Sequence, residues 1–154
     1  MEGLEIKELT VYNDQRGWLS EIIRDDETDY RPAMSYLSMT RPGLLRGPHE
    51  HRDQTDYFCF VGHFRLYVWD NRKDSPTYLE KKVIDTNGIP TVAIVSAGIV
   101  HAYKNVGSSD GLVINMPDRL FMGEGKAEPV DEIRHEDDPS SPFRIFERTR
   151  TEED

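Results

Sequence analysis

Two histidines one residue apart are the first residues of this chain whose spacing could support chemistry. His49 and His51 lie in the stretch RGPHEH, residues 46–51. On a β-strand, side chains at positions i and i+2 point to the same face, so the two imidazoles would project together. A neutral imidazole can bind a metal ion, and it can also take up or release a proton near neutral pH. The pair therefore indicates a metal site or a proton-transfer site, unless both are ordinary polar residues at a strand end.

An acid and a third histidine could join this pair. Asp56 lies shortly after His51, and His101 and Tyr103 are spaced to share one strand face. Imidazole nitrogens together with a carboxylate form a common ligand set for divalent transition metals. We therefore keep two expectations open, either no cofactor or a divalent transition metal on a four-residue set. That set is His49, His51, Asp56 and His101.

Three arginines lie close to predicted strands in a chain whose formal net charge is -10. Arg46 stands just before His49, Arg24 ends an early predicted strand, and a third, Arg41, precedes a Pro-Gly turn. Guanidinium groups bind phosphate through two parallel hydrogen bonds. We expect Arg46 to contact an anionic ligand and Arg41 to be exposed, and both readings stay open for Arg24.

The elements that would position these residues are short strands. Alternating or aromatic-rich and β-branched stretches are separated by turn residues such as Pro42-Gly43 and Asn87-Gly88, and no helical period exceeds about two turns. Many short strands with Gly and Pro turns predict an all-β sandwich or barrel. The predicted strands are 4–12, 18–24, 35–41, 55–62, 63–70, 78–85, 91–98 and 111–117.

Length, charge and cysteine usage bound the function. With 154 residues the chain is expected to form one domain, 1–145, followed by a charged tail, 146–154. The chain has 29 acidic and 19 basic residues, and this excess of acidic residues argues against a nucleic acid partner. The single cysteine, Cys59, fits a reducing compartment. Because neither a signal peptide nor a membrane-spanning apolar run is found, we expect a cytoplasmic protein. The acidic run 135–139 is interpreted as a solvated turn.

Two motifs resemble the halves of the cupin signature. HEHRDQTDYFCFVG, residues 49–62, offers a His-x-His pair, an acid and a closing glycine. The second half is matched by Gly98-x-x-His101-x-x-x-Asn105. The resemblance implies a cupin jelly-roll β-barrel, also called a double-stranded β-helix, in which the three histidines converge. A barrel of this size can hold one small ligand.

Within the cupins, the chain resembles the dTDP-4-dehydrorhamnose 3,5-epimerases over residues 3–145. The stretches that carry the resemblance are YNDQRGWLSEIIR, GLLRGPHEH, DNRKDSPTY and SAGIVHAY. The resemblance implies metal-free chemistry on a nucleotide sugar and a homodimer that exchanges N-terminal strands. By matching positions, His49 would be the base that removes a proton beside a 4-keto group. Arg46, Arg24 and His101 would contact the ligand.

Three departures from that family change the expected proton path. Alignment from His101 puts Ile114 where the family has its acid tyrosine, so Tyr103 or Tyr36 would have to donate the proton. The C-terminal aspartate that orients the family's base is expected to be absent. His51 stands where glutamine is common, and its Arg-Gly-x-His-x-His motif is similar to that of sugar 3,4-ketoisomerases.

The sequence thus predicts an isomerase that forms an enolate beside the 4-keto group of a dTDP-deoxysugar. His49 is the predicted base, with His51 as second proton carrier and Tyr103 as acid. The predicted substrate contacts are Arg46, Arg24, His101 and Tyr36. Two alternatives remain: a metal-dependent cupin, and a catalytically degenerate cupin that binds a sugar nucleotide or a partner in polysaccharide assembly.

Overall fold

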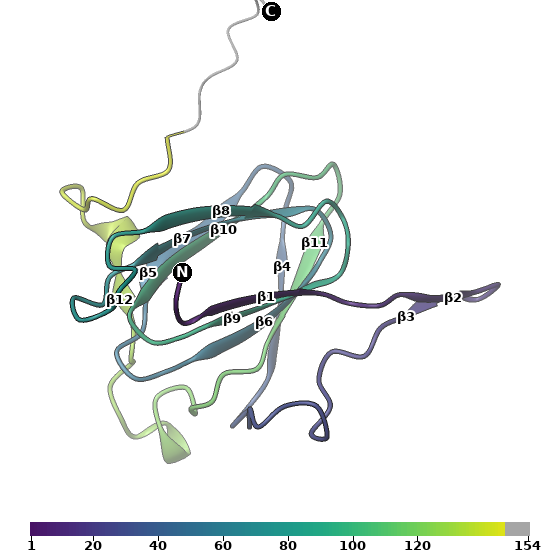
Figure 1. Ribbon diagram of the computed structural model, residues 1–154, viewed down its shortest axis with the longest axis horizontal. Helices are drawn as coiled ribbons and strands as arrows, with labels where there is room; N and C mark the ends of the chain where they lie inside the picture. The colour runs from purple at the N-terminus through teal and green to yellow at the C-terminus, as the bar shows by residue number, and fades with distance from the viewer. Residues whose placement is uncertain (147–154) are drawn as a thin grey trace, which may run out of the picture.

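Two antiparallel five-stranded sheets face each other to form a barrel in the computed structural model, which describes residues 1–146 (Figure 1). The first sheet has the order β1 (Leu4–Glu8), β9 (Thr91–Val95), β6 (Asp56–Val61), β11 (Gly111–Asn115) and β4 (Tyr36–Thr40). The second has the order β12 (Ile133–Arg134), β5 (Leu45–Glu50), β10 (Ile99–Asn105), β7 (Phe64–Asp70) and β8 (Lys81–Asp85). A hairpin of β2 (Tyr12–Asp14) and β3 (Gly17–Leu19) and two short 3₁₀ turns, η1 (Glu124–Lys126) and η2 (His135–Asp137), complete the fold.

The hydrophobic core lies between the two sheets. Alternation along β6 turns Phe58 and Phe60 inward, while Tyr57 and Cys59 face outward. The inward set continues in strands of both sheets, which is why one cluster spans the barrel. That cluster contains Phe58, Phe60, Phe64, Leu66, Val68, Ala93, Val95, Ile99, Tyr103 and Val113.

The predicted all-β jelly-roll class is confirmed, and most predicted strands are present with shorter bounds. The strand predicted over 18–24 is wrong, because β3 ends at Leu19. Ile22 and Ile23 instead pack on the outward residues Tyr57 and Val92, so burial rather than strand pairing explains this apolar stretch. Within residues 1–146, no helix is long and apolar enough to cross a membrane. The boundary predicted at 145 stays a prediction, since 147–154 lie outside the described residues.

The β7–β8 loop is held by a polar network around Asp70, whose side chain is fully buried. Its carboxylate accepts hydrogen bonds from Arg72 Nε at 2.9 Å and from the hydroxyls of Ser75 and Thr77, each at 2.6 Å. These three donors hold the pKa of Asp70 well below its usual range, although burial alone would raise it. The motif DNRKDSPTY is therefore a structural loop.

Arg72 also ties this loop to two distant segments. Its Nη2 donates to the backbone carbonyl of Glu2. Gly3 and Gly98 adopt φ +78 and +79, and a Cβ at Gly98 would lie 2.6 Å from Arg72 Cγ, so the backbone conformation of both positions favours glycine. The guanidinium thus holds the chain start and the β9–β10 turn against the β7–β8 loop.

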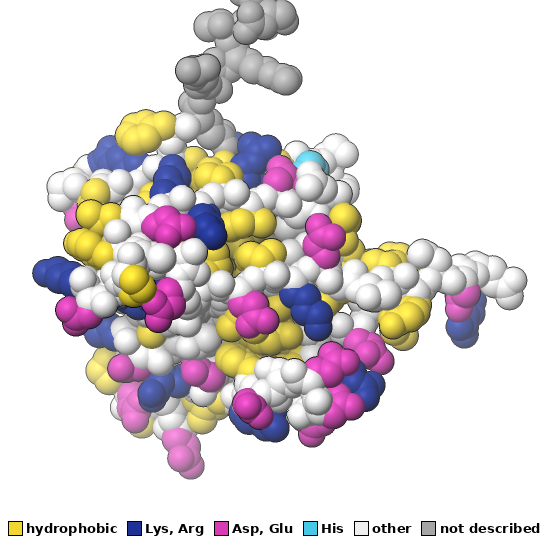
Figure 2. Space-filling model, viewed as in Figure 1, with side chains coloured by type: hydrophobic (Ala, Val, Ile, Leu, Met, Phe, Trp, Pro, Cys, Tyr) yellow, Lys and Arg dark blue, Asp and Glu magenta, His cyan; other side chains and the backbone are white. Residues whose placement is uncertain are grey.

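The β2–β3 hairpin extends away from the barrel as a separate arm (Figure 1). Large apolar side chains on it are exposed, with Tyr12 at 58%, Trp18 at 52% and Leu19 at 61%. Figure 2 shows hydrophobic side chains along this arm and charged ones at its tip. Such exposure on a projecting arm is typical of a surface that a partner covers.

Candidate active site

A bulge in β5 determines which of its residues face the barrel interior. Opposite β10, His49 pairs with His101 and Arg46 pairs with Tyr103, with a register shift between the two pairs. Three steps along β5 therefore match two along β10, and Arg46 and His49 share the inward face. Gly47 adopts φ +88, and a Cβ there would lie 2.6 Å from the His101 carbonyl oxygen. The glycine of the Arg-Gly motif is thus required by this local geometry.

The three predicted histidines meet inside the barrel. The rings of His49 and His101 lie 4.7 Å apart edge-on, and His51 lies 6.1 Å from His49 and 6.0 Å from His101 between ring centroids. One ring nitrogen from each lies within 4.8 Å of the others. The two side chains of the His-x-His pair therefore point to the same side of β5, toward His101, as the strand spacing predicts.

Asp56 is the buried acid beside two of these histidines. Its Oδ2 lies 3.1 Å from His51 Nε2 and 3.4 Å from His101 Nε2. Its Oδ1 accepts hydrogen bonds from Gln54 Nε2 at 2.7 Å and Asn115 Nδ2 at 2.9 Å. With 1% of its surface exposed, the carboxylate depends on these partners for its charge.

His51 is held in its protonated form. Its Nδ1 bonds to the backbone carbonyl of Asp131 and its Nε2 to Asp56, and since both partners are acceptors, both nitrogens must carry hydrogen. Burial lowers the pKa of His51, but the hydrogen bond and charge of Asp56 outweigh it and raise the pKa above its usual range. For Asp56, burial raises the pKa. The hydrogen bond from His51 and the charges of His101 and His51 outweigh burial and bring the pKa of Asp56 below its usual range. The two form a buried ion pair.

His49 is the opposite case. Burial, followed by the charges of His101 and His51, lowers the pKa of His49 to about 2. Among residues 1–146, neither His49 Nδ1 nor His101 Nε2 has a hydrogen-bond partner. His101 donates from its other nitrogen, Nδ1, to the Ile99 carbonyl at 3.0 Å. The interior therefore holds a neutral imidazole with free proton-accepting capacity beside a charged one.

Two carboxylates of the C-terminal segment approach His49, which the sequence prediction missed. Glu132 Oε1 lies 3.6 Å and Glu136 Oε2 lies 3.8 Å from His49 Nδ1. They belong to a segment, residues 131–137, that we call the strap, and its strand β12 pairs with β5 (Figure 1). The absence of the family's C-terminal aspartate stays a prediction, but two glutamates approach the position where an orienting acid would act. A strand of two residues leaves no periodic signal, so only the abundance of acids in this region hinted at it.

The two candidate tyrosines differ in environment. Tyr103 is 6% exposed, and its ring packs on Phe58, Phe60 and Phe64 at centroid distances of 5.8, 5.3 and 5.9 Å. Tyr36 is 45% exposed, which makes it the more accessible of the two.

The hydroxyl of Tyr36 connects to the histidine cluster through one amide. It accepts a hydrogen bond at 2.9 Å from Asn115 Nδ2, which also donates to Asp56. Burial raises the pKa of Tyr36 to about 12, so the phenol keeps its proton. Asn115, like Gln54, was missed because single amides carry no spacing signal. Ile114 packs with the outward cluster around Tyr57, so its side chain points away from the histidines.

The two arginines predicted as ligand contacts lie in different parts of the molecule. Arg46 reaches β4, donating from Nε to Thr40 Oγ1 at 3.0 Å and from Nη2 to the Met39 carbonyl at 2.8 Å. It lowers the pKa of Tyr103 by its charge, although burial raises that pKa more. Arg46 is thus an exposed residue whose guanidinium joins β5 to β4 on the side of Tyr103.

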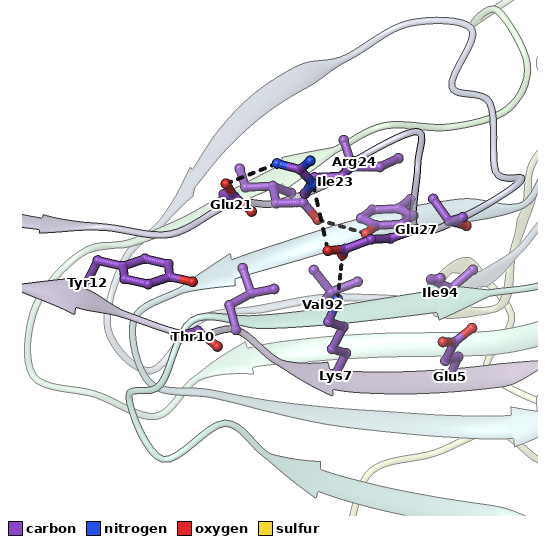
Figure 3. Close-up of a pocket in the computed structure, with 14 residues that line it drawn as sticks. Glu5, Lys7, Thr10, Tyr12, Glu21, Ile23, Arg24, Glu27, Val92 and Ile94 are labelled. Carbon is purple, nitrogen blue, oxygen red and sulfur yellow. Dashed lines mark hydrogen bonds and ion pairs between the residues drawn. The ribbon is translucent and has the colours of Figure 1, made fainter.

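Arg24 is not brought to the histidines. It lines a cavity of about 250 Å³ over the outer face of the first sheet, next to Tyr57 and Val92 (Figure 3). Its guanidinium pairs with Asp26 at 2.6 Å, and more loosely with Glu21 and Glu27. The expectation that Arg24 contacts a ligand of the barrel is not met within this chain, because the segment after β3 packs outside the sheet.

With this geometry established, comparison with known proteins assigns the family. Residues 2–92 match the family described as FdtA, WxcM-like, C-terminal. The chain belongs to the FdtA family. The matched region includes His49, His51, Asp56 and Tyr36, whereas His101 and the strap lie beyond it.

Two curated relatives support the assignment. A probable low-salt glycan biosynthesis epimerase, Agl13 of Haloferax volcanii, is 37% identical over 127 residues, covering 79% of this chain and 81% of that protein. A spore coat polysaccharide biosynthesis protein, SpsL of Bacillus subtilis, is 30% identical over 119 residues, covering 74% and 78%. The predicted epimerase relationship is confirmed by the first of these relatives, and the second shares its link to polysaccharide biosynthesis.

Solved structures share the fold of this FdtA-family chain. A dTDP sugar isomerase from Desulfovibrio desulfuricans superposes with a TM-score of 0.77 and 21% identity over 93% of this chain and 90% of that one. ChmJ, a 3'-monoepimerase from Streptomyces bikiniensis in complex with dTDP-quinovose, superposes with a TM-score of 0.68 and 24% identity, covering 86% and 69%. The jelly-roll barrel of these enzymes is thus the fold found here.

Proposed function

We propose that this protein is a sugar-nucleotide isomerase that moves a proton at a carbon beside the 4-keto group of a dTDP-deoxysugar. The observation that carries the proposal is the pairing of a neutral His49 with a charged His51–Asp56 ion pair inside one barrel. A general base must be unprotonated at working pH, and the lowered pKa of His49 meets that requirement. The epimerase relatives and the dTDP-sugar structures supply the substrate class.

Proton removal would take place at His49 Nε2. Because Glu132 and Glu136 approach Nδ1, they favour the tautomer with hydrogen on that nitrogen. Nε2 then keeps its lone pair. The proton bound to the sugar carbon passes to Nε2, and the electron pair of the broken C–H bond moves onto the 4-keto oxygen as an enolate. The nearby acids stabilise the imidazolium that forms.

The return of a proton points to Tyr36 rather than Tyr103. Since Asn115 donates to the Tyr36 oxygen, the phenolic hydrogen remains available for another acceptor. Tyr103 is enclosed by phenylalanines. A proton returned by His49 itself would add to the face from which it was removed and restore the original configuration, so inversion needs a second donor, for which Tyr36 is the candidate.

The remaining predicted contacts have distinct parts. Arg46 offers a cation at the inner face of β5, which suits a sugar oxygen or a phosphate. His101 supplies the unpaired Nε2 as an acceptor for a sugar hydroxyl. His51 contributes charge that favours the enolate, because the carbanion's negative charge develops close by.

The test is carbon acidity. We would incubate the protein in D₂O with a panel of 4-keto-6-deoxy sugar nucleotides and follow deuterium entry at each sugar carbon by NMR. Entry at C3 or C5 with a rate that depends on protein concentration supports the proposal. Thermal stabilisation by a sugar nucleotide without any deuterium entry would contradict it and favour a degenerate binding protein.

A metal-dependent reaction is the second candidate, favoured by the three histidine nitrogens that lie within 4.8 Å of one another. The donors fit only in part, because both nitrogens of His51 already bond to acceptors and a ligand nitrogen must be unprotonated. Elemental analysis of protein purified without a metal-affinity tag separates the two candidates. A stoichiometric transition metal that is lost on His51→Ala would favour the metal site.

We also propose a homodimer in which the β2–β3 arm packs on a second copy. The exposed Tyr12, Trp18 and Leu19 support this, because a monomer would leave them in water. Removal of the arm's apolar side chains should then lower the mass measured by light scattering. A cytoplasmic location is proposed with it, supported by the lone, unpaired and buried Cys59.

A further inference from the structure

Glu50, the residue between the two active-site histidines, has no part in the proposed reaction and yet is buried. Strand alternation turns its side chain away from the barrel interior, but only 5% of its surface is exposed. Its Oε1 accepts hydrogen bonds from His135 Nε2 at 2.9 Å and from Asn71 Nδ2 at 2.8 Å. A carboxylate buried on the outer face of a strand needs such partners.

His135 is the first residue of η2 and therefore belongs to the strap. It is 14% exposed in its side chain, and its ring lies 4.8 Å from that of Phe143. The acidic run 135–139 was predicted to be a solvated turn. That prediction is wrong for its first residue, which is enclosed between Glu50 and Phe143.

The strap is anchored at its other end as well. The Asp131 carboxylate accepts three backbone N–H groups, from Arg52 at 2.8 Å, Asp53 at 2.9 Å and Gln54 at 3.1 Å. Between Asp131 and His135, β12 pairs with β5 so that Arg134 lies opposite His49.

The two anchors bracket the acids that face the proposed base. Glu132 and Glu136 lie on the span between them or directly after it, and both approach His49 Nδ1. Arg134 pairs with Glu136 at 3.0 Å and Glu132 at 3.8 Å, which offsets the repulsion between the two carboxylates.

We infer that Glu50 and His135 form a latch that positions the strap, and through Glu132 and Glu136 sets which nitrogen of His49 carries the proton. Glu50 and His135 are positioning residues, since neither faces the interior. The same short motif thus supplies the base on one face of β5 and the attachment for its orienting acids on the other. This inference rests on the proposed role of His49 as base.

The matched variants are His135→Gln and His135→Asn. The glutamine amide can reach Glu50 from about the position of the histidine Nε2, whereas the asparagine amide is one methylene too short. The exposed Asp138, whose carboxylate accepts hydrogen bonds from the backbone N–H and the hydroxyl of Ser140, supplies the control variant Asp138→Asn, which leaves its backbone bond to His135 in place. Thermal melting establishes that each variant is folded.

The first readout needs no substrate. Long-range nitrogen–proton NMR correlations of the histidine rings, assigned by comparison with His49→Asn, report the tautomer of His49. We expect Nδ1–H in the wild type, in His135→Gln and in Asp138→Asn, and a mixture of tautomers in His135→Asn. Hydrogen on Nε2 in the wild type would overturn the inference without any variant.

The second readout is kinetic. We expect His135→Asn to lower kcat at least tenfold with KM within about twofold, and His135→Gln to restore most of the loss. Equal activity and an unchanged His49 tautomer in folded His135→Asn would overturn the latch. If no sugar nucleotide exchanges deuterium in the wild type, the proposed function fails while the tautomer measurement still decides the latch.

Discussion

Two regions of the molecule bury a charged carboxylate among polar side chains: the β7–β8 loop around Asp70 and the barrel interior around Asp56. In the loop, the donors that surround Asp70 are themselves engaged, with Arg72 also bonded to the Glu2 carbonyl. In the interior, Asp56 is equally well bonded, but nitrogens of the neighbouring His49 and His101 have no partner among residues 1–146.

The difference separates a structural network from a reactive one. An unpaired polar group in an interior costs roughly 1–3 kcal/mol of stability, so its retention asks for an explanation. The loop has no such cost and its residues serve the fold. The barrel interior bears that cost at His49 Nδ1, which faces the two glutamates of the strap, and at His101 Nε2, which a substrate hydroxyl could use.

Replacing the proposed base should have the largest effect. His49→Asn removes the proton-accepting nitrogen while keeping a polar side chain, and we expect kcat to fall by about 10²–10⁴-fold. The measurement is deuterium entry into the sugar, with the urea midpoint as the control for folding. If deuterium entry persists in this variant, His49 is not the base, and the contrast between a reactive barrel interior and a structural loop fails.

Arg72→Ala should act on stability alone. Breaking a buried pair costs up to about 3–5 kcal/mol, and because Ser75 and Thr77 still bond Asp70 we expect about 2 kcal/mol. Urea unfolding measures this, and the exposed Lys73→Ala in the same loop is the matched control. A loss of kcat in the folded Arg72→Ala protein would show that the network around Asp70 also serves the reaction, which would contradict its purely structural role.

The tyrosines test which hydroxyl belongs to the reactive region. Tyr36→Phe should lower kcat about tenfold, because it removes the phenol that Asn115 orients. Tyr103→Phe should change kcat by less than about twofold, since its ring stays packed among phenylalanines. A larger loss of kcat in Tyr103→Phe than in Tyr36→Phe would make Tyr103 the acid.

The His51–Asp56 pair predicts how stability depends on pH. The folded-state pKa of His51 is raised, so its contribution is complete below about pH 6.5 and is lost as pH rises through the folded value. The pKa of Asp56 is lowered, so its contribution is present above about pH 3.9 and is lost as pH falls through the folded value. His51→Gln should therefore flatten the alkaline side of the profile, by about 1–2 kcal/mol in urea unfolding.

The smallest expected effect is on the acidic side of the pH profile of kcat. Because the pKa of His49 is lowered to about 2, the base stays neutral and kcat should show no inflection near the ordinary histidine pKa of about 6.5. A rate profile measured between about pH 5 and 8, on protein shown to be folded throughout, tests this. An inflection near pH 6.5 would mean that His49 is solvated.

The sequence was informative where a spacing repeats a structural period. The His-x-His pair and the His101–Tyr103 pair were placed on inward faces because strands alternate, and both pairs lie there. The predicted strand over 18–24 failed because apolar residues that cover the outside of a sheet resemble a strand.

The remaining site residues depend on contacts between distant segments. Asn115 faces Asp56 only through the register of β11 on β6, and Glu132 reaches His49 only because β12 pairs with β5. A single amide or acid looks the same in the sequence wherever it ends up. The opposite error occurs at Arg24. Its position in a motif suggested a ligand contact, but the residue lies over the outer face of the first sheet.

The sequence by itself determined the jelly-roll class, the inward histidines and the relationship to the epimerases, because alternation and motif order are local properties. Only the tertiary structure decided the charge states. His49 and His51 have the same side chain two residues apart, yet one is neutral and the other charged. The reason is that Asp56 and the Asp131 carbonyl meet His51, whereas His49 is buried beside like charge without a bonded acceptor.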